Sequence, residues 1–454
     1  MRIPAVPGFS LFLWKLNAKR RNLNSILIVS HKFPEKNGNP NFSLSSAEFS
    51  VYTGRILCYN GETFGKGAMP LRSILRAIGE FMKKADMLLL TLCVTATIYG
   101  IVVISSATNY VGNTRYILVQ TAALIIGVVI YVLFTLVDVD IIAERRELLL
   151  IFCVLFIAML RIWGVKGTSG NRSWLAFSWL PFNIQPAEIC KVFFILILAK
   201  LMSVKQNKIS SPLTVGQLAG ITLLLVGLIL YVSDDAGVAL NYVFIFIVMA
   251  FVGGINLAWF LAGLGVLAAA APFVWSHMRD DQQNRILMVL DPTIDPDGIG
   301  VRYQTKFSLH ALQNGGMAGQ GLYHGSMVQS GQVPAQHTDF IFSSIGEELG
   351  MIGCLAVLLL LTAIILRCVY VGIKSGNYMN RLICVGIASM LAFQILVNVG
   401  MCLGIFPVIG LTLPFFSYGG SSIVTMFLAM GIVSGIHMRP APDSNARYIR
   451  PKFK

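Results

Sequence analysis

Residues 86–106 read DMLLLTLCVTATIYGIVVISS, a run of apolar and small residues whose one charge is the first residue. A helix that crosses the hydrocarbon core of a bilayer needs about 20 such residues. The whole chain of 454 residues is 56% hydrophobic and 12% charged, whereas soluble proteins carry roughly 25% charged residues. The sequence therefore predicts an integral membrane protein.

Similar apolar runs recur along the chain, near 115–137, 147–164, 184–203, 214–232, 237–254, 256–275, 340–367, 381–403 and 417–437. Together with the first run they predict an all-α polytopic membrane protein with about ten transmembrane helices. The segment 276–339 is the one long polar connection, and we expect it to be an extracellular loop.

Basic residues gather in alternate connections, which sets the expected orientation. They are Lys83 and Lys84, Arg145 and Arg146, Lys205 and Lys208, the cations of 367–381, and those of the tail 439–454. Cytoplasmic loops are enriched in Lys and Arg, so both termini are expected in the cytoplasm and 276–339 outside. The net charge of +14 fits this pattern, and no basic stripe with interleaved aromatic residues suggests nucleic-acid binding.

Composition also divides the chain into three parts. Residues 1–68 are polar, basic and mixed, and we expect a poorly ordered extension or the product of a mis-called start upstream of Met69. Residues 69–438 form the expected membrane domain, and 439–454 form a basic cytoplasmic tail. The eight cysteines are scattered and lack metal-like or disulfide-framework spacing.

Two groups of ionisable residues lie at or near membrane depth, where charge is costly and marks functional candidates. Glu188 and Lys191 are three residues apart and share one helical face. They either form a neutral pair that holds the bundle together, or Lys191 contacts an anionic substrate group. Asp235 begins a predicted helix, where it either caps the N-terminus or binds a ligand.

The expected outer loop carries an acidic cluster, Asp291-Pro-Thr-Ile-Asp295-Pro-Asp297-Gly298. Asp-Pro and Asp-Gly steps favour turns, so the cluster reads as a solvated loop or as a site at the membrane surface. Arg285 just before it either pairs with an Asp or holds a pyrophosphate. His337 and Asp339 stand where the chain returns to the membrane.

The stretch 398–422 is dense in Pro and Gly and contains Ser417. Such a composition indicates an irregular or re-entrant segment, which a membrane protein tolerates only when the segment is buried in protein or lines a cavity. The alternative is close packing of helices through small residues.

Several motifs occur in a characteristic order between about 80 and 440. They are Gly170-Asn-Arg172-Ser-Trp174, Gln185-Pro-Ala-Glu188-Ile-Cys-Lys191, Asp235-Ala-Gly237, Asp291-Pro-Thr-Ile-Asp295-Pro-Asp-Gly298, His337-Thr-Asp-Phe-Ile-Phe342, Gly346-Glu-Glu-Leu-Gly350 and Leu413-Pro-Phe-Phe-Ser-Tyr-Gly-Gly-Ser-Ser422. In these motifs the chain resembles the SEDS family, the RodA, FtsW and SpoVE type of protein in bacterial envelope growth. It departs from the family pattern at Val301-Arg302, Phe307 and Ala335.

The resemblance implies a peptidoglycan glycosyltransferase that polymerises lipid II outside the cytoplasmic membrane, in cell-shape, division or sporulation wall synthesis. A class B penicillin-binding protein, the transpeptidase, is the implied partner. The catalytic residue is then Asp295, as a general base or as a ligand of Mg²⁺ or Mn²⁺. The expected substrate-binding residues are Arg172, Glu188, Lys191, Asp235, Arg285, His337, Asp339 and Ser417. A lipid-linked precursor flippase and a non-catalytic scaffold for a transpeptidase are the alternatives.

Overall fold

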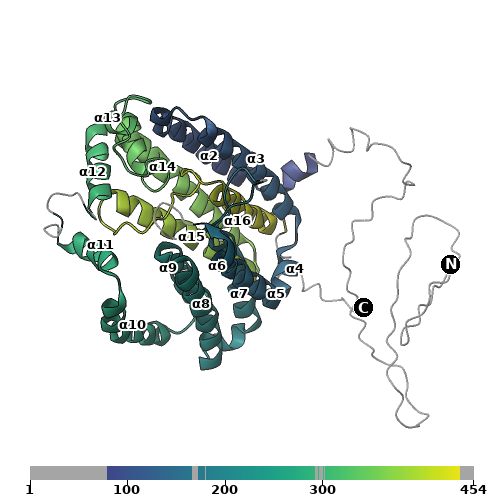
Figure 1. The fold of residues 1–454 in the computed structure, drawn as a ribbon. Coiled ribbons are helices and arrows are strands. Elements are labelled where there is room, and N and C mark those ends of the chain that lie inside the picture. Colours follow the sequence, from purple (N-terminus) through teal and green to yellow (C-terminus); the bar gives the residue numbers. More distant parts are fainter. Residues whose placement is uncertain are drawn as a thin grey trace, which may run out of the picture. The chain divides into compact units, whose positions relative to one another are not determined.

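The computed structural model describes residues 79–165, 172–178, 180–291, 295, 300 and 302–439, without the side chains of Asp281 and Leu290 (Figure 1). The expectations for 1–68 and for nearly all of the tail 439–454 lie outside the described residues. Within them the chain is helical almost throughout, as its apolar runs predict.

Each predicted apolar run forms helix. The long helices are α2 (Met87–Ala107), α3 (Arg115–Leu136), α5 (Arg146–Ala158), α7 (Pro186–Val204), α8 (Pro212–Ser233), α9 (Ala236–Val252), α10 (Leu257–His277), α14 (Ile341–Lys374), α15 (Tyr378–Cys402) and α16 (Gly420–Met438). Short elements join them: η1 (Asn109–Val111), α4 (Val139–Glu144), α6 (Leu160–Trp163), β1 (Gly164–Val165), β2 (Trp174–Leu175) and η2 (Gln206–Lys208). The two strands pair antiparallel, Gly164 opposite Leu175.

Among the described residues, seven helices are long and apolar enough to cross a membrane: α2, α3, α8, α10, α14, α15 and α16. The helices of the other three predicted spans are too polar or too short to be counted with these seven. Helix α7 carries Glu188, Lys191 and Lys200, α9 has 17 residues, and α5 has 13. The chain is therefore a multi-pass membrane protein, and its more polar helix α7 is largely buried among its neighbours.

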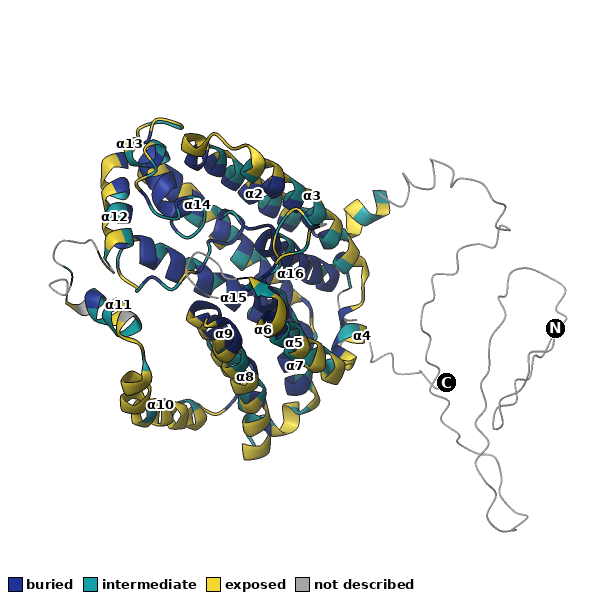
Figure 2. Ribbon diagram, viewed as in Figure 1, coloured by how far each residue is buried: buried dark blue, intermediate teal, exposed yellow. Residues whose placement is uncertain are grey.

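The buried helices stand at the centre of the bundle and the lipid-like surface lies outside (Figure 2). Helix α16 packs along α3, and α15 packs against α14, α9 and α7. By contrast, none of the residues of α10 is buried. The exposed side chains of the outer helices are mostly large and apolar, as a surface facing lipid tails requires.

The described residues of the segment 276–339 include helices, where the sequence predicted a polar loop. They are α11 (Asp280–Leu290), α12 (Tyr303–Gly315) and α13 (Ser326–Gln329), which the sequence did not predict. These helices are short and polar, so no apolar run reveals them. Helix α12 packs on α14, where Gly315 leaves no room for a side chain against Gly346.

Residues 403–419 connect α15 to α16 with irregular backbone, as the density of Pro and Gly predicts. Leu413, Phe415 and Phe416 of this connection are each at most 1% exposed. Phe415 adopts a positive φ of 66°, and Gly410 one of 72°. The second half of the irregular segment, 411–419, is thus mostly buried in protein, which is the condition under which a membrane protein tolerates such backbone.

Helix α2 holds this segment in place through a close approach at Gly100. A Cβ added to Gly100 would lie 2.8 Å from both the Cα and the carbonyl oxygen of Phe416. Backbone atoms at this distance cannot move aside without shifting the segment. Gly216 of α8, in contrast, has nothing within 4 Å of an added Cβ.

We therefore expect Gly100→Ala to lower the free energy of unfolding by about 1–3 kcal/mol through overpacking. The matched control Gly216→Ala should be neutral or stabilising, since it adds helix propensity in open space. Thermal unfolding of the purified proteins in detergent measures both. Equal midpoints for the two variants would contradict the close approach.

Candidate functional site

A cavity of about 200 Å³ opens where α7 and α9 begin. Its walls come from the strand region before α7, from the residues before α14 and from the irregular segment 403–419. They include Ser173, Trp174, Gln185, Glu188, Asp235, Thr338, Asp339, Gly410, Leu411, Thr412, Tyr418 and Ser422. Three of the predicted site residues, Glu188, Asp235 and Asp339, thus meet in one place although they are distant in sequence.

The predicted pair of Glu188 and Lys191 is confirmed. The Lys191 ammonium donates to Glu188 Oε1 at 2.7 Å, and both side chains are buried. Glu188 lines the cavity, whereas Lys191 lies behind it. The second oxygen, Glu188 Oε2, is buried without a hydrogen-bond partner among the described residues. A buried acceptor left unpaired costs free energy, so this atom is poised for a donor from a ligand.

Asp235 caps α9, as the sequence suggested. Its Oδ1 accepts from Val238 N at 3.0 Å, and Oδ2 accepts from Ser173 Oγ and Gln185 Nε2, each at 3.2 Å. Sequence analysis gave Ser173 and Gln185 no role, although both lie inside motifs that drew attention. Their side chains fix the direction in which the carboxylate faces the cavity.

Asp339 adds a third carboxyl group to the cavity. Burial, and then the nearby Asp235 carboxylate, raise the pKa of Asp339 to about 6. The carboxyl is therefore ionised above about pH 6 and neutral below it. A cavity with three carboxyl groups offers acceptors to hydroxyl and amide donors, which suits a sugar more than a phosphate.

A second cavity of about 520 Å³ adjoins the first and shares Trp174, Thr338, Tyr418 and Gly419 with it. His337 belongs to this second cavity. Its ring packs on Tyr116 at 5.1 Å and on Tyr418 at 5.8 Å between centroids, and burial lowers the pKa of His337. Sequence analysis gave the aromatic residues Trp174, Tyr116 and Tyr418 no role, because single aromatic residues carry no pattern of their own.

Ser417, Arg285 and Arg172 line neither cavity, and the first two hold parts of the wall. Ser417 Oγ donates to Thr338 O at 2.7 Å and accepts from Leu413 N at 2.8 Å. Arg285 Nη1 donates to Val408 O at 2.9 Å, which ties α11 to the segment 403–419. Arg172 directly precedes Ser173 at the cavity wall. A substrate contact for each stays a prediction.

Asp295 lies at the N-terminus of α12, outside the lining of both cavities. Its Oδ2 accepts from Gly300 N at 3.0 Å and Arg302 N at 2.9 Å. Backbone N–H groups at a helix start favour a negative charge. Asp295 is half-buried, whereas Asp291 is exposed and Asp297 lies outside the described residues. Arg302, a departure from the family pattern, thus helps to hold the carboxylate.

Helix α12 contacts the segment that forms part of the cavity wall. Thr305, in the first turn of α12, lies 3.1 Å from a Cβ added to Gly404, at the start of the segment 403–419. The same segment lines the first cavity with Gly410, Leu411 and Thr412. Helix α12, whose start Asp295 holds, and the cavity therefore both border the segment 403–419.

Across the described residues, no three His, Cys, Asp or Glu side chains are grouped so as to hold a metal ion. Mg²⁺ is often held by one or two carboxylates together with substrate phosphate, which needs no such group. The divalent ion stays a prediction.

Curated relatives match most of the chain. Stage V sporulation protein E of Bacillus subtilis is 32% identical over 366 residues, which cover 77% of this chain and 96% of that protein. Peptidoglycan glycosyltransferase MrdB of Escherichia coli K12 is 31% identical over 359 residues, covering 78% and 93%. Probable peptidoglycan glycosyltransferase FtsW of Geobacter metallireducens is 30% identical over 367 residues, covering 79% and 96%.

Solved structures share the fold. One comes from a study of polymerization and crosslinking by a peptidoglycan synthase complex, with a TM-score of 0.66 and 30% identity over 81% of this chain and 99% of that one. The rod shape determining protein RodA of Thermus thermophilus gives a TM-score of 0.59 and 27% identity, over 79% and 98%. The sequence model of the FtsW, RodA and SpoVE family of cell cycle proteins matches residues 86–441, and the chain belongs to that family.

Proposed function

We propose that this chain, a peptidoglycan glycosyltransferase, polymerises lipid II into glycan strands at the outer face of the bacterial cytoplasmic membrane. The observation that carries the proposal is the placing of Asp295. Its half-buried carboxylate is held by two backbone N–H groups at the start of α12, the helix whose Thr305 meets the segment that walls a carboxylate-lined cavity. Relatives named peptidoglycan glycosyltransferases support the reaction type.

The reaction joins two sugars. The 4-hydroxyl of an acceptor sugar attacks the anomeric carbon of a lipid-pyrophosphate donor, a new C–O bond forms, and the bond to the pyrophosphate breaks. Asp295 accepts the hydroxyl proton as general base, which typically contributes about 10²–10⁴-fold to the rate. Its two backbone donors hold the carboxylate in one orientation, so the proton acceptor is positioned before the substrate arrives.

The departing pyrophosphate needs cations. Arg285 presents a planar fork of donors and uses Nη1 to hold Val408, which fixes its position beside the cavity wall. Arg172 is the second cation, next to Ser173. Lys191 takes part through Glu188, whose charge it neutralises at 2.7 Å. In the alternative role, the Asp295 carboxylate would hold a divalent ion that neutralises the pyrophosphate.

The two cavities hold sugar units away from the reacting hydroxyl group, since Asp295 lines neither of them. Carboxylates of Glu188, Asp235 and Asp339 accept from hydroxyl groups in the first cavity, while Trp174 and Tyr418, shared by both, offer aromatic faces. Aromatic and polar side chains together are what a sugar needs, because one face of the ring is apolar and its edge is polar.

The orientation and the partner complete the proposal. Both termini lie in the cytoplasm, because the Lys and Arg of the short connections then share one side. A class B penicillin-binding protein cross-links the strands. The similar structure from a synthase complex of polymerization and crosslinking supports such a partner. A flippase would use the same cavity but would move lipid II without making strands.

The first prediction concerns Asp295. Asp295→Asn keeps an oxygen that accepts from Gly300 N and Arg302 N, so we expect a folded protein. Strand synthesis from lipid II should fall by about 10²-fold or more, because the proton acceptor is lost. The control Asp280→Asn, at the exposed first residue of α11, should polymerise normally. Wild-type polymerisation by Asp295→Asn would contradict the proposed role of that carboxylate. Transport of lipid II without strand synthesis, unchanged in Asp295→Asn, would favour the flippase.

The second prediction separates the structural and substrate roles of the buried pair. Lys191→Met alone leaves the Glu188 carboxylate uncompensated and should cost about 3–5 kcal/mol of stability. Adding Glu188→Gln should restore most of that loss, as thermal unfolding would measure. We expect the double variant to be folded yet slow in strand synthesis, because the cavity loses a carboxylate. Wild-type synthesis by the double variant would make the pair purely structural.

The third prediction follows from the raised pKa of Asp339. Below about pH 6 its carboxyl is neutral and accepts hydrogen bonds more weakly. The KM for lipid II should therefore rise as pH falls through about 6. In Asp339→Asn the KM should be high at every pH and should lack this step. The control Asp280→Asn should keep the rise of KM near pH 6. If Asp339→Asn also keeps this rise, a group other than Asp339 causes it.

A further inference from the structure

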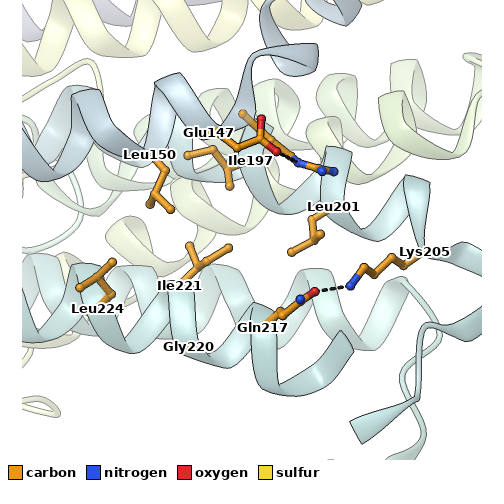
Figure 3. A pocket seen from close by; sticks show the side chains of 10 residues that line it. Glu147, Leu150, Ile197, Leu201, Lys205, Gln217, Gly220, Ile221 and Leu224 are labelled. Carbon is orange, nitrogen blue, oxygen red and sulfur yellow. Dashed lines mark hydrogen bonds and ion pairs between the residues drawn. The ribbon is translucent and has the colours of Figure 1, made fainter. Parts of the chain in front are cut away.

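A separate groove of about 470 Å³ lies between α5, α7 and α8 (Figure 3). Helix α7 links it to the first cavity: Glu188 lies in the first turn of α7, whereas Lys205 follows its last turn. At about 1.5 Å per residue, the groove and the cavity are at opposite ends of that helix. The groove therefore has no part in the proposed reaction.

The floor of the groove is apolar. It is formed by Leu150 of α5, Ile197 and Leu201 of α7, and Ile221 and Leu224 of α8. Its width comes from Gly220 of α8, because nothing lies within 4 Å of a Cβ added there. A concave apolar surface at this depth in a membrane protein will be covered by lipid or by another helix.

The rim of the groove is polar and mostly cationic. Arg146 pairs with Glu147 at 2.8 Å, and Lys205 contacts Gln217 across the mouth of the groove (Figure 3). The two cations therefore outnumber the single carboxylate. Both contacts are at least partly exposed, and exposed pairs are worth little. A stronger anion can accordingly take the place of Glu147 or Gln217.

We propose that this groove binds an anionic phospholipid. An acyl chain lies along the apolar floor, and the phosphate accepts from Lys205 and Arg146 at the rim. Charge decides between lipid classes, because an anionic headgroup matches a rim with one net positive charge. The orientation proposed above places this groove in the inner leaflet of the membrane. The binding of the phospholipid does not depend on that orientation.

A partner helix is the competing occupant, since Gly216 and Gly220 have the spacing of a helix-packing motif. The chemistry of the rim favours lipid. Two long cationic side chains stand at the mouth, where a passing helix would have to bury them, whereas a phosphate pairs with them. The groove volume also falls in the usual range of about 300–1,000 Å³ for small-molecule sites.

The test titrates the purified full-length protein in neutral detergent with phosphatidylglycerol, phosphatidylcholine or inorganic phosphate. Binding is read by native mass spectrometry and by the rise in unfolding temperature. We expect phosphatidylglycerol alone to bind and stabilise. Lys205→Gln should weaken it about fivefold, the worth of one basic residue near an anionic lipid, and Lys205→Arg should restore it.

Two further variants locate the site. Gly220→Leu should remove phosphatidylglycerol binding by filling the groove without a backbone clash. Its matched control is Gly263→Leu, at an equally open glycine of α10 away from the groove. Equal binding of phosphatidylcholine or phosphate, or equal effects of the two leucine variants, would overturn the proposal. The proposal would also be overturned if the protein self-associates, if Gly220→Leu abolishes that self-association, and if no lipid stabilises the protein selectively. That combination would place a partner helix in the groove.

Discussion

The site depends on how the irregular segment 403–419 satisfies its backbone inside a membrane protein. Buried N–H and C=O groups need partners, and lipid supplies none. Gln120 of α3 donates to Ser417 O and accepts from Gly419 N, and Asn398 of α15 donates to Leu411 O. These side chains replace the missing helical hydrogen bonds. The cavity wall exists because neighbouring helices hold this backbone open instead of letting it coil.

Electrostatics divides the molecule into two regions with different chemistry. At one end of α7, carboxyl groups of Glu188, Asp235 and Asp339 face a cavity, with Lys191 behind them. At the other end, Lys205 and Arg146 dominate a groove. Hydrogen-bond acceptors for uncharged donors thus gather at one end of α7, and donors for anions gather at the other end. The two regions therefore suit different ligands.

The sequence predicted the features that depend on local pattern. Apolar length located the long helices, the spacing of Glu188 and Lys191 predicted their pair, and Pro and Gly marked the irregular segment. Helix α12 was missed because its stability comes from packing on α14 and not from an apolar run. The joining of Asp235 to Ser173 and Gln185 was also beyond sequence pattern, since contacts between distant residues depend on how the helices pack.

The anchoring of α12 by Asp295 has a consequence for the proposed reaction. A carboxylate accepts from Gly300 N and Arg302 N more strongly than a neutral acid would. If Asp295 takes up a proton at each turnover, its hold on the start of α12 is weakest just after the new bond forms. In the proposed mechanism, the chemical step and the release of the start of α12 would therefore depend on the same carboxylate.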